Sequence, residues 1–421
     1  MKTQGLGRRR FLKEGVGLAG LAVGAMRSAS GQTLGSAIPE ARPLDSLRAY
    51  GERSRFVDSV RTPVEGKPVP FYTKLTLTPL QDSIGIITPS ALHFVSSHGF
   101  DPPEIDPRQH RLMIHGMVDR PLIFTVEELQ RLPSVSRIHG IECAGNSYLF
   151  LADRKAKTVQ ETHGKTSCSE WTGVLLSLLL REAGVQKGGN WIVAEGAEAG
   201  KHSMSFPVEK GLDDVIVAYG QNGEPVRPEQ GYPLRLVIPG WEGTRNIKWL
   251  RRIKVGDQPY MTKFESTGYP SLRPDGKSRW FLFEMGPKSV ITFPSGEQRL
   301  PGRGFYEITG LAWSGRGAIR RVEVSTDGGR SWKDAQLQEP VLRIAHTRFR
   351  FPWNWDGEEA MLQCRCTDDL GDVQPSLAEL GKLWGVKPDY WLSTTNFTNH
   401  FNAIQPWKVN RDGSVHNAIF S

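Results

Sequence analysis

The chain has 421 residues and a formal net charge of +8, with 53 Lys and Arg against 45 Asp and Glu. Residues 1–30 hold six basic residues and one acidic residue, so +5 of this charge lies there and the remaining chain is near +3. No basic block with interleaved aromatic residues remains, which excludes nucleic acid as an expected partner. The length beyond residue 30 is sufficient for two domains with substantial cores.

Residues 1–30 have the features of a twin-arginine export signal. Arg8-Arg9-Arg10 precede a weakly apolar run, Gly15–Met26, and small residues follow at Ser28-Ala29-Ser30. A membrane anchor is the alternative, but the run has only 12 residues, whereas a spanning helix needs about 20. The pattern therefore predicts export to the periplasm as a folded, cofactor-containing protein. No second apolar run is long enough to span, so no membrane segment is expected in the mature chain.

The sequence predicts an N-terminal arm over residues 31–65 and a domain of many short strands over residues 66–286. The chain has 28 Pro and 45 Gly and few long helical patterns, which favours short strands and ordered loops. Thr125 and Glu128 form a capping box that predicts a helix to about Leu132. Leu at helical spacing predicts a second, core-facing helix over Gly173–Ala183, ended by Gly184. Strands are expected at Arg111–His115, Ser136–Cys143 and about 190–195, 214–219, 233–238 and 249–255, and a long polar loop at 149–170.

Residues 287–421 predict a second domain of a different kind. Alternating apolar and polar residues recur at Tyr306–Trp313, Ile319–Ser325, Val341–Phe351 and Ala360–Thr367. Strands at this spacing, with a Gly-rich turn at 326–329, are typical of a β-sandwich. The predicted fold class is therefore α+β, with a β-sandwich as the C-terminal domain.

One cysteine stands at a predicted corner of the first domain. An apolar approach leads into Cys143, and the turn Ala144-Gly145-Asn146 follows. Gly and Asn tolerate positive φ, so this turn can present the thiolate, a soft metal ligand, on a rigid support. A buried free Cys is the alternative. The chain has four Cys and no CxxCH motif, so no haem of its own is expected.

Anion-binding residues cluster between positions 230 and 250. Arg235 lies on a predicted strand, a Gly240-x-x-Gly243 loop follows, and Arg245 and Lys248 come next. Glycines allow backbone amides to approach an anion, and Arg and Lys supply charge. The cluster suits a phosphate or a polar ring system, although surface arginines flanking a strand are the alternative.

Taken together and in order, these stretches resemble the sulfite oxidase family of molybdopterin enzymes. The matching stretches are Ile87–Pro89 with Phe94 and His98, Cys143–Asn146, Trp171–Val174, Asn222–Pro225 and Gly240–Leu250. Further stretches resemble the SoxC group of that family, the molybdenum subunits of sulfane dehydrogenases: Thr162–Gly164, Ser167–Trp171 and Asn402–Trp407.

The resemblance implies a molybdenum–molybdopterin cofactor for which Cys143 is the single protein ligand. It further implies that Tyr269 lies at the active site. The implied cofactor-binding residues are Phe94, Ser96, His98, Cys143, Glu198, Gln230, Arg235, Arg245, Asn246, Ile247 and Lys248. The family's cofactor transfers oxygen to a sulfur atom, and electrons leave singly to a haem. The resemblance also implies that the sandwich serves dimerisation, giving a homodimer.

Three positions depart from the family pattern. Ser96 stands where the family has a substrate-binding Arg, Gln230 where it has His, and Glu198 where it has Asp. A Ser cannot make the bidentate charged contact that holds a free oxyanion, so free sulfite is a less suitable substrate. Basic residues of the 149–170 loop are candidates for the missing positive charge, with a solvated loop as the alternative: Lys155, Lys157, His163 and Lys165.

The sequence therefore predicts a periplasmic molybdenum subunit that oxidises sulfane sulfur bound to a SoxY-like carrier protein. Electrons are expected to pass to a separate c-type cytochrome, a SoxD-like subunit. A sulfite:cytochrome c oxidoreductase acting on free sulfite is the alternative enzyme. A non-catalytic periplasmic binding module with the same fold is the alternative of a different class.

Overall fold

The computed structural model describes residues 53–54, 56–64, 75–97, 101–147, 156–273, 275–387, 390–393 and 400–419. Residues 59–421 form one compact unit of the chain. The expected export signal (1–30), most of the expected arm, Lys155 and His98 lie outside the described residues.

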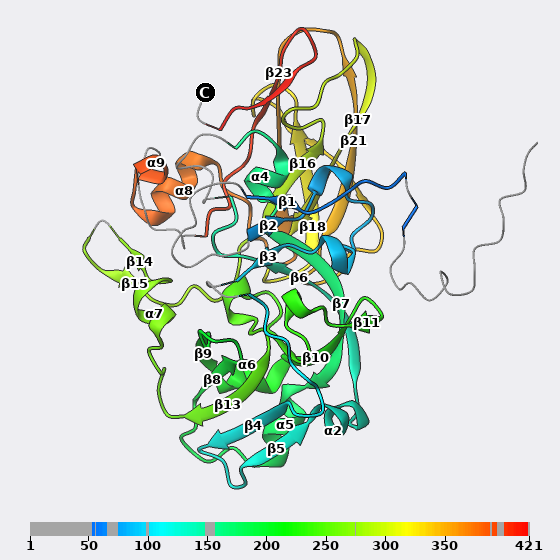
Figure 1. The fold of residues 1–421 in the computed structure, drawn as a ribbon. Coiled ribbons are helices and arrows are strands. Elements are labelled where there is room, and N and C mark those ends of the chain that lie inside the picture. The colour runs from blue at the N-terminus through cyan, green and yellow to red at the C-terminus, as the bar shows by residue number, and fades with distance from the viewer. Residues whose placement is uncertain are drawn as a thin grey trace, which may run out of the picture. The chain divides into compact units, whose positions relative to one another are not determined.

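Two five-stranded sheets form the framework of the first part of this unit (Figure 1). The first has the order β11 (Glu224–Pro225), β10 (Ile216–Gln221), β7 (Thr166–Leu175) and β6 (Val135–Glu142), with β12 (Arg235–Val237) also paired to β10. The second has the order β5 (Leu122–Thr125), β4 (Arg111–Gly116), β13 (Leu250–Gly256), β8 (Trp191–Gly196) and β9 (Ser203–Pro207). Only β13 and β4 pair in parallel; the other pairs in these sheets are antiparallel.

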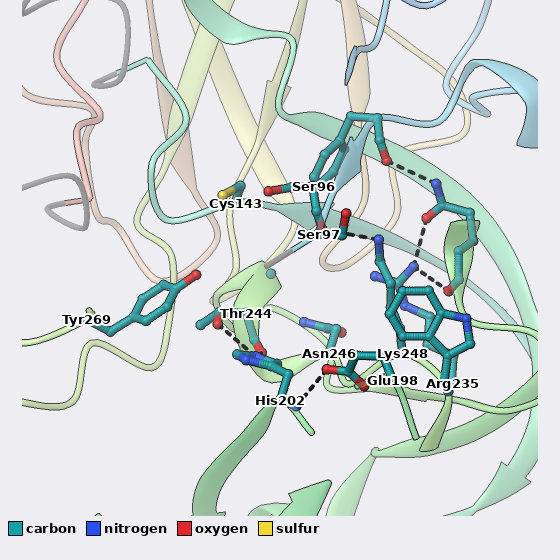
Figure 2. Close-up of a pocket in the computed structure, with 14 residues that line it drawn as sticks. Ser96, Ser97, Cys143, Glu198, His202, Arg235, Thr244, Asn246, Lys248 and Tyr269 are labelled. Atoms are coloured by element: carbon teal, nitrogen blue, oxygen red, sulfur yellow. Dashed lines mark hydrogen bonds between the residues drawn. The ribbon is translucent and has the colours of Figure 1, made fainter. Parts of the chain in front are cut away.

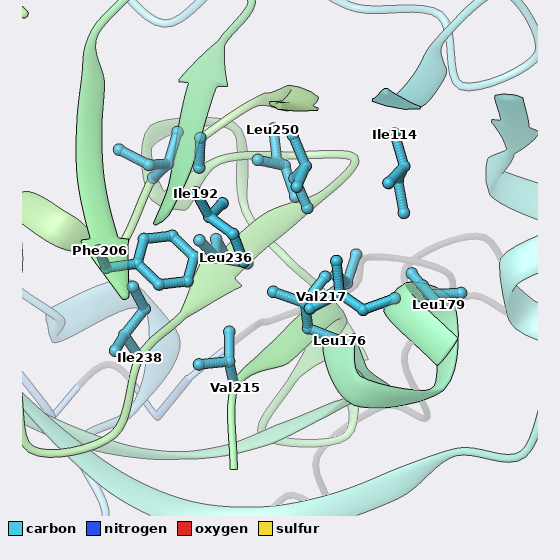
Figure 3. Packing of buried hydrophobic residues seen from close by; sticks show 14 of the residues in the cluster. Ile114, Leu176, Leu179, Ile192, Phe206, Val215, Val217, Leu236, Ile238 and Leu250 are labelled. Carbon is cyan, nitrogen blue, oxygen red and sulfur yellow. The ribbon is translucent and has the colours of Figure 1, made fainter. Parts of the chain in front are cut away.

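A core of fully buried aliphatic residues joins these sheets to two short helices, α5 (Leu176–Ala183) and α6 (Val208–Asp213) (Figure 3). Leu176 and Leu179 of α5 pack with Val217 of β10 and Leu236 of β12 in this core. Helix α5 ends at Gly184, whose φ of 71° is the left-handed conformation that glycine adopts without strain. The expected helix thus ends as predicted but begins at Leu176, because residues 173–175 still belong to β7.

The predicted polar loop at 149–170 is wrong for its second half. Helix α4 (Val159–His163) and strand β7 occupy it, and β7 pairs with β6 from Glu142↔Thr166 to Val135↔Gly173. The strand looks polar in sequence because its buried hydroxyls are satisfied internally: Ser167 Oγ lies 2.6 Å from Thr78 Oγ1. His163 and Lys165 are buried, so they do not form a solvated basic loop.

The helix predicted from its capping box is present as α2 (Val126–Arg131). Thr125 Oγ1 accepts from the Glu128 amide at 3.1 Å, and a Glu128 carboxylate oxygen accepts from the Thr125 amide at 2.8 Å. The reciprocal bonds satisfy two donors at the start of the helix, as the pattern predicts.

The second part of the unit is a β-sandwich. One sheet has the order β16 (Lys288–Phe293), β17 (Gly304–Trp313), β21 (Thr347–Trp355) and β20 (Gln336–Gln338). The other has the order β19 (Lys333–Asp334), β18 (Ile319–Ser325), β22 (Ala360–Asp368), β23 (Trp407–Val409) and β24 (Val415–Asn417). Their inward side chains, including Cys364 and Cys366 as free thiols, share one core. The predicted fold class is confirmed.

Smaller elements complete the unit. They are the sheet β1 (Thr62–Pro63), β2 (Leu75–Leu77) and β3 (Val95–Ser96), the helix α7 (Lys263–Thr267), the hairpin β14 (Ser271–Leu272) and β15 (Ser278–Arg279), and the helices α8 (Leu377–Trp384) and α9 (Tyr390–Ser393). Single 3-10 turns lie at Leu80–Asp82, Ser90–Leu92, Pro228–Gln230 and Gly243–Arg245. Within the described residues, no helix has the length and apolar character that a membrane crossing requires.

Candidate active site

A pocket lies where β3, β6, β12 and the loops after β8 and β12 meet. Aromatic side chains and a few convergent polar and charged groups line it, as is typical of a small-molecule or cofactor site. Nine of the sequence-predicted site residues line it: Phe94, Ser96, Cys143, Glu198, Gln230, Arg235, Asn246, Lys248 and Tyr269. Figure 2 shows Cys143 on one side of the cavity and Arg235, Lys248 and Glu198 on the opposite side.

Cys143 occupies the corner that follows β6 and is 7% exposed. Its amide donates to Lys165 O at 3.0 Å, and its carbonyl accepts from the Asn146 amide at 2.9 Å. The expected positive φ falls on Ser147, at 72°, and not on Gly145 or Asn146. Asn146 stabilises the corner through its side chain instead, because Nδ2 donates to Glu142 Oε1 at 2.9 Å and Oδ1 accepts from the Lys165 amide at 3.0 Å.

Gly243, in the loop after β12, lies against the corner that contains Cys143. A Cβ there would lie 2.9 Å from Glu142 O and 3.2 Å from the Cα of Cys143. The loop after β12 can therefore approach the cysteine corner closely only because this residue has no side chain.

Two cations face the cavity without a carboxylate partner. Arg235 Nη1 donates to Gln230 Oε1 at 2.8 Å and to Gln230 O at 3.0 Å, and Lys248 Nζ donates to Ser96 O at 3.2 Å. Burial lowers the pKa of Arg235 to about 9. Burial, and secondarily the charge of Arg235, lowers the pKa of Lys248 to about 7. Neither side chain forms an ion pair among the described residues, so both remain available to an anionic ligand.

Glu198 and His202 form the floor of the cavity. Glu198 Oε1 accepts from the His202 amide at 2.6 Å, while Oε2 is buried and has no hydrogen-bond partner among the described residues. Burial raises the pKa of Glu198 and lowers that of His202 to about 4. His202 Nε2 lies 2.9 Å from Thr244 O, which fits a neutral ring that donates from this nitrogen.

Two of the predicted cofactor-binding residues do not line the cavity. Arg245 Nη1 donates to Ser205 O at 2.5 Å, and its guanidinium pairs with Glu242 and Glu265 and lies over the Phe283 ring at 4.7 Å. The Ile247 side chain belongs to the aliphatic core, and its carbonyl accepts from the Leu236 amide at 2.8 Å. Of the basic loop residues, neither His163 nor Lys165 lines the cavity.

Comparison with known proteins identifies the family. Residues 98–264 match the model of the oxidoreductase molybdopterin binding domain, and residues 279–395 match that of the Mo-co oxidoreductase dimerisation domain. Sulfite oxidase of Gallus gallus is 30% identical over 336 residues, which cover 72% of this chain and 72% of that protein. The chain belongs to the sulfite oxidase family.

Other relatives extend this result. The crystal structure of the sulfane dehydrogenase SoxCD from Paracoccus pantotrophus is 39% identical with a TM-score of 0.79, and the match covers 93% of this chain and 95% of that chain. A nitrate reductase [NADH] of Solanum lycopersicum is 31% identical over 369 residues. The match spans 39% of that nitrate reductase, and the match to mouse mitochondrial sulfite oxidase spans 61% of that protein. Within its family this chain is SoxC-like.

The cavity of this sulfite oxidase family member fits a molybdopterin in its donor chemistry. A thiol at one side suits a soft metal, and the buried Arg235 and the partly buried Lys248 at the other side suit a phosphate. Arg235 Nε, Ser97 Oγ and Glu198 Oε2 are buried without hydrogen-bond partners among the described residues. Such atoms are costly to bury unless a ligand satisfies them. A pterin with its phosphate offers both acceptors and donors for this purpose.

The structure adds four cavity residues that the sequence did not suggest: Ser97, His202, Thr244 and Trp249. Ser97 follows the predicted Ser96, and His202 follows the predicted Glu198 by four residues, so both lay close to a sequence signal. Thr244 and Trp249 flank predicted residues but have side chains that no motif chemistry singled out.

Proposed function

We propose that this chain is a molybdenum-dependent dehydrogenase that oxidises sulfane sulfur bound to a carrier protein. The proposal includes a SoxY-like carrier, a SoxD-like c-type cytochrome as electron acceptor, and a homodimer formed through residues 287–421. The observation that carries it is one cavity in which Cys143 faces the buried Arg235 and the partly buried Lys248, neither of them ion-paired among the described residues, in a chain 39% identical to SoxCD over 93% of its length.

In this proposal Cys143 ligates the metal from its corner. Arg235 and Lys248 hold the phosphate and polar ring of the pterin, and Gln230, Glu198 and Asn246 provide hydrogen bonds. Phe94 and His98 complete the set, together with the backbone at Ile247, within the domain 66–286. When bound, the cofactor supplies two-electron oxygen-atom transfer to sulfur, with stepwise re-oxidation by the cytochrome.

Tyr269 is the chain's own polar group on the substrate side. It is 8% exposed, and Figure 2 shows its hydroxyl directed toward the side of the cavity where Cys143 lies. A phenol there can donate a hydrogen bond to a substrate oxygen or sulfur atom without adding charge. Cys143 and Tyr269 are therefore the catalytic residues of the proposal.

Ser96 favours a carrier-bound substrate over free sulfite. Its neutral side chain lines the cavity, and its backbone carbonyl oxygen accepts a hydrogen bond from the Lys248 ammonium. A free dianion is held best by a bidentate guanidinium, which this position lacks. A sulfur chain attached to a protein needs less charge at this point, because protein–protein contacts supply part of the binding free energy.

Free sulfite oxidation is the second candidate, because sulfite oxidases are among the relatives. We also propose a periplasmic location, supported by Arg8-Arg9-Arg10 and the short apolar run after them.

The test uses the exported, purified chain with cytochrome c as acceptor. Molybdenum and pterin are quantified first, and turnover is then measured with sulfite alone and with the carrier protein whose cysteine has been converted beforehand to a persulfide. Turnover that requires the carrier supports the proposal, whereas equal efficiency on free sulfite selects the second candidate. A folded, exported chain that contains no molybdenum would leave only a non-catalytic binding role.

A further inference from the structure

Glu142, the residue before Cys143, is buried and its carboxylate receives three hydrogen bonds. Asn146 Nδ2 and Lys288 Nζ donate to Oε1 at 2.9 and 2.8 Å, and Trp313 Nε1 donates to Oε2 at 2.7 Å. Glu142 is 4% exposed, and the Lys288 residue is 0% exposed. Both carboxylate oxygens are therefore fixed by donors, with the water largely excluded.

Two of these donors come from the β-sandwich and form one cross-strand pair. Lys288 begins β16 and Trp313 ends β17, and the register of the two strands places them opposite each other. Besides its bond to Glu142, Lys288 Nζ donates to the carbonyl oxygen of Asn146 at 3.4 Å. Trp313 Nε1 donates to the second carboxylate oxygen of Glu142. Strands β16 and β17 of the sandwich thus contact the residues on both sides of Cys143, Glu142 before it and Asn146 after it.

Further contacts keep the same corner against the sandwich. The Gly140 amide donates to Ile344 O at 2.9 Å, and Thr166 Oγ1 lies 2.9 Å from His346 Nε2. The His346 ring lies 5.3 Å from that of Trp313. These contacts hold β6 and β7 against the sandwich beside the corner. Among the described residues, the hydrogen bonds from the sandwich to the turn itself go to Glu142 and Asn146.

We propose that Lys288 and Trp313 position Cys143 through Glu142, so that the sandwich is a structural part of the metal-ligand corner as well as a dimerisation domain. The inference rests on the proposed function for the ligand role of Cys143. Lys288 and Trp313 are positioning residues, since neither lines the cavity. A carboxylate with one donor removed keeps its charge but loses its fixed orientation. The adjacent cysteine then loses its fixed position.

The first test measures the rate at which Cys143 is alkylated in the full chain produced without cofactor. Cys168, Cys364 and Cys366 are 0% exposed, and burial raises the pKa of Cys168 and Cys364 to about 12. Alkylation of the native chain by iodoacetamide therefore reports on Cys143, with Cys143→Ser as the background. Trp313→Phe removes the donor to Oε2 and exchanges the indole for a smaller ring, and we expect alkylation about tenfold faster than in the natural chain.

Trp355→Phe is the matched control. Trp355 is a sandwich tryptophan of similar burial whose Nε1 donates to Glu358 O at 2.7 Å, away from the corner. The two variants lose the same ring and one hydrogen bond each, so a general loosening of the sandwich raises both rates alike. Equal alkylation rates in Trp313→Phe and Trp355→Phe overturn the proposal.

Glu142→Gln provides a second variant in case Trp313→Phe folds poorly. The amide keeps the volume of the side chain but offers one acceptor oxygen to three donors, and the same acceleration is expected. In the loaded enzyme, both variants should shift the thiolate-to-molybdenum absorption band, while Trp355→Phe leaves it in place. If Cys143→Ser retains the metal, the proposed function fails; if the alkylation rate is unchanged in Trp313→Phe and Glu142→Gln, only the positioning role fails.

Discussion

Replacing Lys248 by Met should stabilise the cofactor-free chain and at the same time weaken its hold on the cofactor. Lys248 carries a desolvated ammonium beside Arg235, and within the described part of the chain this ammonium donates to Ser96 O at 3.2 Å. The folded pKa of about 7 lies below the ordinary value of 10.5. Folding of the empty chain therefore opposes protonation of this amine, and removing the amine removes that cost.

The size of the effect depends on pH. Below pH 7 the amine is protonated in both states, and the full shift corresponds to about 5 kcal/mol. At pH 9 the remaining gap to 10.5 corresponds to about 2 kcal/mol. Lys248 is partly exposed, so solvent screening reduces both figures to about half, and the lost hydrogen bond takes back about 1 kcal/mol. The variant should be about 1.5 kcal/mol more stable at pH 6 and about equal at pH 9.

Urea unfolding of the cofactor-free chain at pH 6 and pH 9 measures both values. Lys187→Met, at an exposed lysine, serves as the control and should change the free energy of unfolding little and equally at both pH values. In the loaded enzyme, Lys248→Met should lose cofactor faster on dialysis. A variant less stable than the natural chain at pH 6, or a difference that does not vary with pH, refutes the reasoning.

Three further substitutions separate the roles of the remaining residues. Cys143→Ser should remove molybdenum and turnover while leaving the circular dichroism spectrum unchanged, and metal retained at the natural level would exclude Cys143 as the ligand. Ser96→Arg should lower the KM for free sulfite about tenfold by supplying a charged fork; an unchanged KM would show that Ser96 does not face the substrate. Arg245→Met should cost the cofactor-free chain about 3–5 kcal/mol in urea unfolding, because Glu265 is left buried without its cation. A loss below about 1 kcal/mol would return Arg245 to the list of cofactor contacts.

Local patterns predicted the elements whose physics is local. The capping box at Thr125 and the glycine stop at Gly184 depend on residues within one or two turns, and both are present in the structure. The sandwich was predictable because alternation with period two reports which side of each strand is buried. The polar start of β7 was not predictable. The hydroxyls of Ser167 and Thr166 can be buried because they hydrogen-bond to Thr78 and His346, which are far away in sequence.

The two arginines near the Gly-x-x-Gly loop show where spacing alone ends. Both arginines are buried. Arg235 precedes the loop and Arg245 follows it, yet of the two only Arg235 lines the cavity. The difference arises from carboxylates brought in by the fold: Glu265, from α7, meets Arg245, whereas Arg235 meets only the neutral Gln230. A charge left without a counter-charge by the fold is the better indicator of a ligand site.

The same reasoning predicts strong coupling between cofactor loading and folding. Arg235 and Lys248 are desolvated without a counter-ion among the described residues, and Glu198 leaves a buried acceptor unused, so the empty cavity stores an unfavourable free energy. An anion placed between the cations raises both pKa values toward their ordinary range and removes that cost. A ligand at 100 times its dissociation constant adds about 2.7 kcal/mol by mass action. Loading before export, which the N-terminal sequence pattern predicts, would therefore deliver the chain in its more stable form.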